Sequence, residues 1–338
     1  MARDPSALEK YRTMLAEQIQ YFKVTQYFFF KQWGELKDYA NQKGIKIIGD
    51  MPIYVAADSV EVWTKPELFQ LDKERNPLFV AGVPADQFSA TGQLWGNPLY
   101  DWEEHKKQGY AWWIHRIEES FKIYDVLRID HFKGFSDYWQ VDGKAEVAKD
   151  GSWQPGPGYD LFKAVKEQLG DLPIIAEDLG NIDDKARKLL ADCNYPGMKI
   201  LQFGFEDVSG KSLDSPHYCI PHSIVYTGTH DNDVTNGWYN SLTEQQQQYI
   251  NDYTHRREDE SICQAMIRQL FATVSNTAIA TMQDVLDLPA SSRMNVPSTI
   301  GGNWQWRMQQ SDLTQDKKDF LAKMTTLYPV SYTHLRAH

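Results

Sequence analysis

Amphipathic segments with helical spacing alternate along the chain with short, continuously apolar segments. Residues 6–43 show helical spacing, Gly44 interrupts it, and KIIGD (46–50) is typical of a short buried strand. Helices are also expected over 113–121, 161–169, 183–192 and 257–274, and further apolar segments lie at 126–130, 173–178, 197–205, 222–233 and 276–288. Gly170 follows one of these helices and is typical of a helix C-cap.

This alternation indicates an α/β protein with a parallel sheet covered by helices. No Gly-x-Gly-x-x-Gly follows an expected strand, so a dinucleotide-binding fold lacks its anchor. The spacing of the strand ends favours a (β/α)₈ TIM barrel with insertions over a doubly wound sheet. We expect one catalytic domain over residues 1–328, with loop-rich insertions at about 54–110 and 141–158.

Composition narrows the class of protein. The chain has 338 residues, of which 42% are hydrophobic and 24% charged, and a net charge of −11 that argues against a nucleic-acid partner. No apolar run reaches the roughly 20 residues of a membrane span, and the N-terminus has no signal-peptide pattern. Three scattered cysteines, Cys193, Cys219 and Cys263, favour a reducing cytoplasm. The 11 Trp and 18 Tyr fit either ordinary packing or a surface that stacks on sugar rings.

Acidic side chains recur where the expected strands end. These positions are Asp50, Asp130, the pair Glu177–Asp178 and the pair His230–Asp231. A single acid after a strand is usually a turn residue, but the C-terminal strand ends of a barrel converge on one mouth. Because like charges gathered at one rim cost stability, four such strand ends point to a functional site.

The residue types limit the chemistry of this site. No His-x-His pair is present, so a metal-dependent hydrolase is disfavoured and no metal is expected. There is no Gly-x-Ser-x-Gly motif and no cysteine at a strand end, which leaves serine and cysteine nucleophiles without support. Clustered carboxylates suit glycosidic-bond chemistry, in which one carboxylate attacks and another delivers a proton.

Six motifs carry a family resemblance. They are GIKIIGDMPIYVAADSVEVW, GVPADQFSATGQLWGNPLYDW, VLRIDHFKGF, IIAEDLG, YTGTHDND and IGGNWQWR. In this order and spacing they resemble the motif series of the 4-α-glucanotransferases, the amylomaltase or disproportionating-enzyme family of the α-amylase clan. The resemblance implies a (β/α)₈ barrel without a cofactor. It also implies transfer of α-1,4-glucan segments between maltooligosaccharide donors and acceptors, with retention of configuration.

The resemblance also implies catalytic roles at matching positions. Asp130 would be the nucleophile that forms a covalent glucosyl intermediate, and Arg128 would keep it ionised and oriented. Glu177 would be the general acid/base with a raised pKa. Asp231 would be the third carboxylate, which binds sugar hydroxyls and favours ring distortion, whereas Asp178 is expected to be structural.

Further positions would bind or support the sugar. The resemblance places His230 against the sugar at the cleavage position and Asp50 at the rim. Gln93 and Trp95 match a loop that closes over the acceptor side, where an indole can stack on glucose. For His131, a buried supporting histidine and a substrate contact are equally open.

Two alternatives to transfer remain at this stage: a retaining α-glucan hydrolase with the same carboxylates, and a non-catalytic glucan-binding fragment. Family members carry a longer N-terminus with a Ser-Pro-Tyr motif, so we expect an N-terminally truncated chain whose barrel lacks its first strands. Residues 329–338 match nothing in the family and are expected to be a non-native tail.

Overall fold

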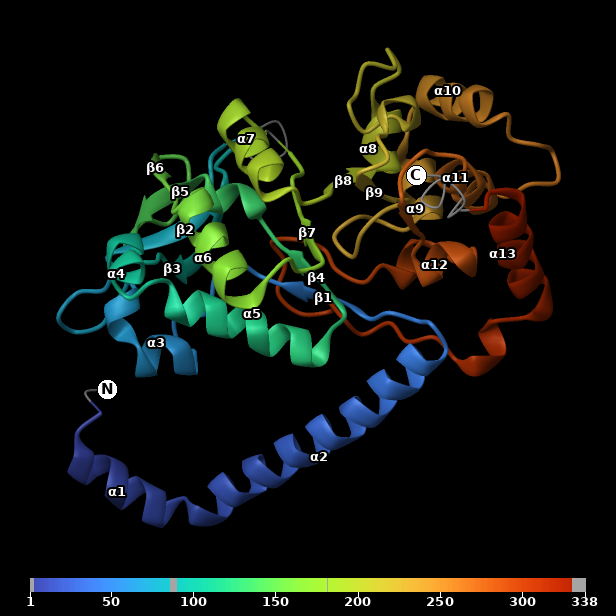
Figure 1. Cartoon of the computed structure of the whole chain (residues 1–338). Helices are drawn as coiled ribbons and strands as arrows, with labels where there is room; N and C mark the ends of the chain where they lie inside the picture. Colours follow the sequence, from blue (N-terminus) through green and yellow to red (C-terminus); the bar gives the residue numbers. More distant parts are fainter. Residues whose placement is uncertain (1–2, 86–89, 181, 330–338) are drawn as a thin grey trace. The chain divides into compact units, whose positions relative to one another are not determined.

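The structure is a computed structural model that describes residues 3–85, 90–180 and 182–329 (Figure 1). The chain divides into two units, Met1–Tyr195 and Pro196–His338, and each is described by itself. Residues 86–89, within the motif that contains Gln93, and residues 330–338 of the expected tail lie outside the described residues.

The first unit begins with two helices, α1 (Pro5–Met14) and α2 (Ala16–Gln42). The single helix predicted over 6–43 is therefore divided at Leu15. Helix α2 is attached to the helix α5 region near its C-terminal end, where Trp33 Nε1 donates to Ile123 O at 2.8 Å and Lys37 Nζ donates to Tyr124 O at 2.9 Å. Large aromatic side chains are exposed around the rest of α2: Tyr21, Phe22, Tyr27, Phe28, Phe29 and Phe30.

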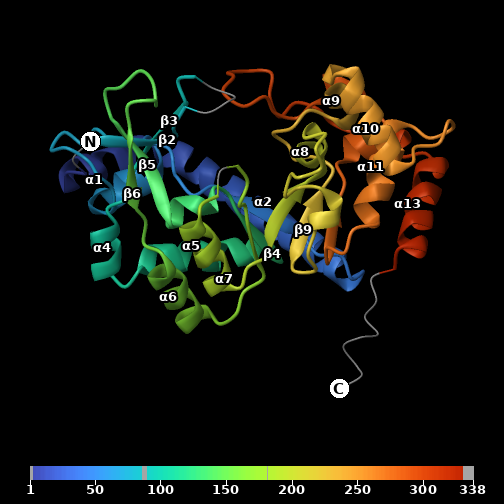
Figure 2. The same cartoon turned by 90° about the horizontal axis from the view of Figure 1, so that it is seen from above.

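A three-stranded parallel sheet lies at the centre of the first unit. Its order is β1 (Ile48–Met51), β4 (Val126–Ile129), β7 (Ile174–Ala176). Helices α5 (Ala111–Ile123), α6 (Tyr159–Leu169) and α7 (Asp184–Cys193) follow one another beside it (Figure 2). Trp113 and Ile117 of α5 are fully buried, and Leu127 and Ile129 of β4 belong to the same core. The helical and apolar periodicity predicted this part of the fold, and the C-cap expected at Gly170 is present.

A second, antiparallel sheet takes β3, β2 and β6 from the segments predicted as insertions, whereas most of β5 precedes the second of them. Its order is β3 (Gln93–Pro98), β2 (Phe79–Val83), β5 (Asp137–Asp142), β6 (Ser152–Pro155). Short helices α3 (Val60–Thr64) and α4 (Trp102–Lys107) lie in the same part of the chain. These segments are thus more regular than the loop-rich pattern predicted. Strand β2 pairs with β5 across more than sixty residues of sequence at one end, where Phe79 lies opposite Asp142.

The second unit contains another three-stranded parallel sheet, in the order β10 (Thr277–Ile279), β9 (Ser223–Tyr226), β8 (Gly197–Ile200). Its helices are α8 (Leu201–Glu206), α9 (Thr235–Ser241), α10 (Glu244–Thr254), α11 (Ile262–Phe271), α12 (Met282–Val285) and α13 (Gln315–Leu327). Helix α11 begins with a capping box between Ser261 and Gln264. The apolar segment 197–205 is strand only to Ile200, after which the chain turns directly into α8.

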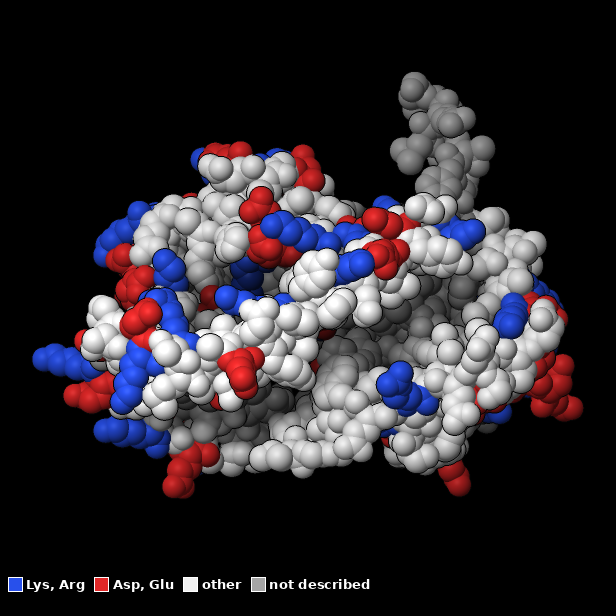
Figure 3. All heavy atoms as spheres, turned by 90° about the horizontal axis from the view of Figure 1, so that it is seen from below, with Lys and Arg blue, Asp and Glu red and all other residues white. Residues whose placement is uncertain are grey.

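The α/β class is confirmed. In the described part of the chain the strands form three sheets and not one closed barrel. Within the same ranges, every helix is too short or too polar to span a lipid bilayer. Acidic and basic side chains are interspersed over the face shown in Figure 3.

Candidate active site

Arg128 lies at the centre of a group of charges on the parallel sheet of the first unit. Alternation along β4 buries Leu127 and Ile129 in the core and turns Arg128 to the other side. The sheet register pairs Arg128 with Asp50 of β1. Arg128 Nη1 donates to both carboxylate oxygens of Asp50, at 2.7 and 2.8 Å, and to Asp130 Oδ1 at 2.9 Å.

The burial of Arg128 is unusual for a cation. The residue is only 8% exposed, whereas the Asp50 and Asp130 side chains are 42% exposed. Burial alone would lower the pKa of the guanidinium, but the two carboxylates outweigh it and raise that pKa above its ordinary value. Arg128 therefore stays charged, and it holds Asp130 beside the sheet by a charge-assisted hydrogen bond.

Glu177 follows β7 directly, next to the end of β4. Its Oε2 accepts from the backbone N–H of His131 at 2.7 Å, and its Oε1 accepts from that of Leu179 at 2.9 Å. Burial raises the pKa of Glu177 to about 7, the charge of Asp130 adds to this, and Arg128 and the two N–H groups oppose it. Two neighbouring strands thus present one carboxylate paired with a cation and one that holds a proton near neutral pH.

His131 links these two carboxylates through the backbone. Its φ of 50° lies in the left-handed region, and its backbone N–H donates to Glu177 Oε2. Gly134 packs so closely that a Cβ there would lie 3.1 Å from His131 Cδ2. Burial lowers the pKa of His131 to about 4, so the ring is neutral at pH 7. The His131 residue as a whole is half-buried beside the carboxylates, which is compatible both with a supporting role and with a contact to a ligand.

Trp95 of β3 covers His131. The two rings lie 4.8 Å apart, edge to face, and Trp95 Nε1 donates to Gln93 Oε1 at 3.2 Å. Trp95 remains 37% exposed, so part of the indole is open to a ligand. The structure thus brings Gln93 and Trp95 to the same corner of the first unit as Asp130 and Glu177, on a strand and not on the loop predicted.

Lys133 ties the chain after Asp130 to the chain after Glu177. Its Nζ forms ion pairs with Asp137 and, at 2.8 Å, with Asp183, and it lies 4.4 Å from the centre of the Trp153 ring. The hydrogen bond from Lys133 lowers the pKa of Asp183 to about 2. Asp183 also caps α7 by accepting from Ala186 N. These contacts fix the segments on which both carboxylates stand.

His230 and Asp231 belong to the second unit, where they follow β9. His230 Nε2 lies 3.4 Å from Asp231 Oδ2, and the His230 ring lies 5.0 Å from that of Trp304. A cavity of about 230 Å³ adjoins His230 and is lined by that residue and by Val234, Gln283, Met294 and Trp304, among others. The pattern of strand ends did not indicate Met294 or Trp304, although Trp304 lies in the quoted IGGNWQWR motif.

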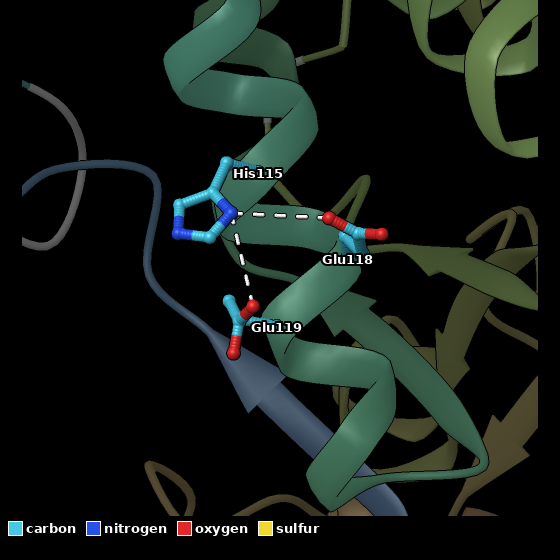
Figure 4. A group of neighbouring side chains, drawn as sticks. All are labelled: His115, Glu118 and Glu119. Atoms are coloured by element: carbon cyan, nitrogen blue, oxygen red, sulfur yellow. Dashed lines mark ion pairs between the residues drawn. The ribbon is translucent and has the colours of Figure 1, made fainter.

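Possible metal ligands gather elsewhere. In the described ranges, His115, Glu118 and Glu119 on α5 are the group whose ligand atoms lie close enough together, with His115 Nδ1 3.8 and 3.7 Å from the two carboxylates (Figure 4). Their spacing of three and four residues on one helix face accounts for the cluster, and all three side chains face solvent.

Comparison with known proteins gives a consistent result. Residues 1–314 match the family model described as 4-alpha-glucanotransferase (Glyco_hydro_77). The 4-alpha-glucanotransferase of Streptococcus pneumoniae serotype 4 is 53% identical over 328 residues, which are 97% of this chain and 65% of that protein. The 4-alpha-glucanotransferase of Clostridium butyricum is 45% identical, over 96% of this chain and 67% of that protein. This chain thus spans about two thirds of the length of these relatives.

Solved structures agree. Amylomaltase from Streptococcus agalactiae in complex with acarbose has a TM-score of 0.95 and 60% identity, covering 96% of this chain and 66% of that one. Amylomaltase from Corynebacterium glutamicum shares the fold, with a TM-score of 0.71 at 16% identity, covering 87% of this chain and 48% of that one. Together with the match over residues 1–314, these relatives show that the chain belongs to the 4-alpha-glucanotransferase family.

Proposed function

We propose that this chain carries 4-alpha-glucanotransferase activity: it moves α-1,4-glucan segments between maltooligosaccharides by a retaining double displacement. The main support is the pair formed by Asp130 and Glu177 at the ends of adjacent strands. One carboxylate is paired with a buried cation, and the other has a pKa raised to about 7. A retaining glycosidase mechanism needs this combination of a nucleophile and an acid/base.

In the first step, an Asp130 carboxylate oxygen attacks the anomeric carbon of the donor. The glycosidic C–O bond breaks, and Glu177 gives its proton to the departing oxygen. In the second step, Glu177 takes the proton of an acceptor hydroxyl, whose oxygen attacks the same carbon and releases Asp130. Two inversions give net retention, and the acceptor glucan replaces water.

The electrostatics of the pair suit both steps. Burial and the charge of Asp130 raise the pKa of Glu177, so Glu177 is largely protonated before the first step at pH values below about 7. Bond formation to the sugar neutralises Asp130 and removes that part of the shift. The pKa of Glu177 then falls, and Glu177 becomes the base that the second step requires.

The remaining side chains have supporting roles in this proposal. Asp231 and His230 bind sugar hydroxyls at the cleavage position, and Asp50 supports the site through Arg128. Gln93 and Trp95 contact the acceptor side. His131 orients Glu177 through its backbone N–H and packs under Trp95.

We further propose that residues 1–328 form one catalytic domain of the (β/α)₈ class. The superposition of 96% of this chain on 66% of the Streptococcus agalactiae amylomaltase supports a shared architecture. A cytoplasmic location is proposed on the scattered, free Cys193, Cys219 and Cys263.

Incubation with maltotriose tests the reaction. The expected result is redistribution into glucose plus longer oligosaccharides, because an acceptor glucan competes with water for the glucosyl intermediate. The products are separated by high-performance anion-exchange chromatography over time. Products that are only shorter than maltotriose would instead indicate the hydrolase, and unchanged maltotriose would contradict a catalytic role for the chain.

The pH profile tests the role of Glu177. Because Glu177 must be protonated for the first step, kcat/KM for maltotriose is expected to fall about tenfold per pH unit above about pH 7. A profile that stays flat to pH 9 would contradict the assignment.

The raised pKa of Glu177 also makes the free energy of unfolding depend on pH. The protonated form favours the folded chain, so this contribution is present below about pH 4.5 and is lost as the pH rises through about 7.

A further inference from the structure

Two residues on one short segment hold the His230–Asp231 pair from the side. Asn295 Nδ2 donates to Asp231 Oδ1 at 2.6 Å, and Arg293 Nη2 donates to the backbone oxygen of Asp231 at 2.7 Å. The backbone N–H of Asn295 donates to His230 O at 3.1 Å. The side chain and the backbone of Asp231 are thus both held by a segment more than sixty residues further along the chain.

The segment that contains Arg293 and Asn295 is itself fixed by hydrogen bonds. Arg293 Nε donates to Asn295 O at 2.8 Å, so one guanidinium binds both its own segment and that of Asp231. Arg293 and Asn295 are half-buried. Trp304 N donates to Met294 O at 2.7 Å, and this places the Trp304 ring against His230. Trp304 is 61% exposed and lines the cavity of the second unit.

The two Asp231 oxygens therefore have different surroundings. Oδ1 accepts the amide of Asn295, whereas Oδ2 lies 3.4 Å from His230 Nε2. An amide hydrogen bond to one oxygen restricts the rotation of the carboxylate about its side-chain bonds. Without this bond, ordering the side chain when a ligand binds would cost conformational entropy. The hydrogen bonds to the backbone oxygens of His230 and Asp231 fix the position of the main chain from which the Asp231 side chain extends.

We propose that Arg293 and Asn295 are positioning residues for Asp231, fixing the third carboxylate in the orientation that meets sugar hydroxyls in the transition state. This inference rests on the proposed function. Displacing such a group by about 1 Å can cost about 100-fold in rate, although the group itself remains present. The effect is expected in kcat more than in KM, because the contact strengthens in the transition state.

Asn295→Ala and Arg293→Met test the proposal, with Arg187→Met on the exposed surface of α7 as a matched arginine control. Asn295→Ala and Arg293→Met are expected to lower kcat for maltotriose about 10- to 100-fold with KM changed less than about threefold, while Arg187→Met leaves both unchanged. The double variant Asn295→Ala with Asp231→Ala should lose no more than Asp231→Ala alone. Parental kcat, or losses that multiply in the double variant, would overturn the proposal.

Asn295→Asp adds a pH-dependent readout. The new carboxyl faces Asp231, with His230 and Arg293 also beside the pair, and it can replace the amide donor only when protonated. The ratio of variant to parental kcat is therefore expected to rise as the pH falls from 8 to 5, and a constant ratio would contradict the role of the donor.

A crystal structure of Asn295→Ala separates this inference from the proposed function. The Asp231 carboxylate is expected to leave its present rotamer or to occupy several. An unchanged, single position would overturn the inference even if the chain redistributes maltotriose. Conversely, a displaced Asp231 in a chain that leaves maltotriose unchanged would support the positioning role while contradicting the reaction.

Discussion

Replacing Asp130 with Asn is expected to lower the rate of maltotriose redistribution by at least about 10⁴-fold, because an amide cannot form the glucosyl ester. The substitution is close to isosteric, and the amide oxygen can still accept the hydrogen bond from Arg128 Nη1. Folding is thus expected to survive, with a Tm within a few degrees of the parental chain. Chromatography of the products and calorimetry of the protein measure the two effects.

The control for this substitution is Asp160→Asn. Asp160 lies on α6, where it pairs with Lys106 on the exposed surface, and its loss should leave the rate unchanged. A rate for Asp130→Asn above about one tenth of the parental value, with Asp160→Asn equally active, would remove Asp130 from the mechanism. The chain would then act through another group or as a binding module.

Arg128→Met is expected to affect activity, stability and pH dependence together. Removing the guanidinium takes away the cation that Asp50 and Asp130 share. Loss of one partner of a buried pair costs about 3–5 kcal/mol, and since both carboxylates are 42% exposed we expect about 2 kcal/mol. Urea unfolding of the parental chain and the variant measures this difference.

The catalytic effect of Arg128→Met is expected to exceed about 100-fold, because Asp130 loses its orienting partner. Arg128 also opposes the raised pKa of Glu177, so without it that pKa rises further. The alkaline limb of the kcat/KM profile should therefore move to higher pH in whatever activity remains. A variant with parental stability and an unmoved limb would show that Arg128 does not act through these carboxylates.

The periodicity of the sequence predicted the parallel strands and the helices that cover them. VLRI and IIA are continuously apolar, and Trp113 and Ile117 mark the buried face of α5. Because parallel strands end at the same edge of a sheet, the sequence also predicted that Asp50, Asp130 and Glu177 would lie together. The contact of Arg128 with Asp50 was not predicted.

The parts that were not predicted depend on pairings between distant segments. The antiparallel sheet depends on the pairing of β2 with β5, which lie far apart in the sequence. These strands are not joined by a short hairpin turn, so no turn motif predicts their pairing. The contact of Trp95 with His131 depends on this sheet, so the strand position of Trp95 was missed. Asn295 reaches Asp231 from a segment without regular secondary structure, where periodicity carries no information.

The break between α1 and α2 has a local origin that periodicity also missed. Leu15 adopts φ −105° and ψ 19°, and its N–H still bonds to Tyr11 O, so the helix ends and restarts within one residue. Apolar spacing continues through the break, and a reading by spacing alone therefore joins the two helices.

Trapping the covalent intermediate tests the central claim most directly. Fluoride leaves without a proton, so the Glu177→Gln variant given α-maltotriosyl fluoride should complete the first step but be slow in the second, which needs the base. Peptic digestion and mass spectrometry should then find a maltotriosyl group on the peptide that contains Asp130, attached to the Asp130 side chain. An adduct on another residue, or no adduct while fluoride is released in a single-turnover burst, would contradict a glucosyl-aspartate at Asp130.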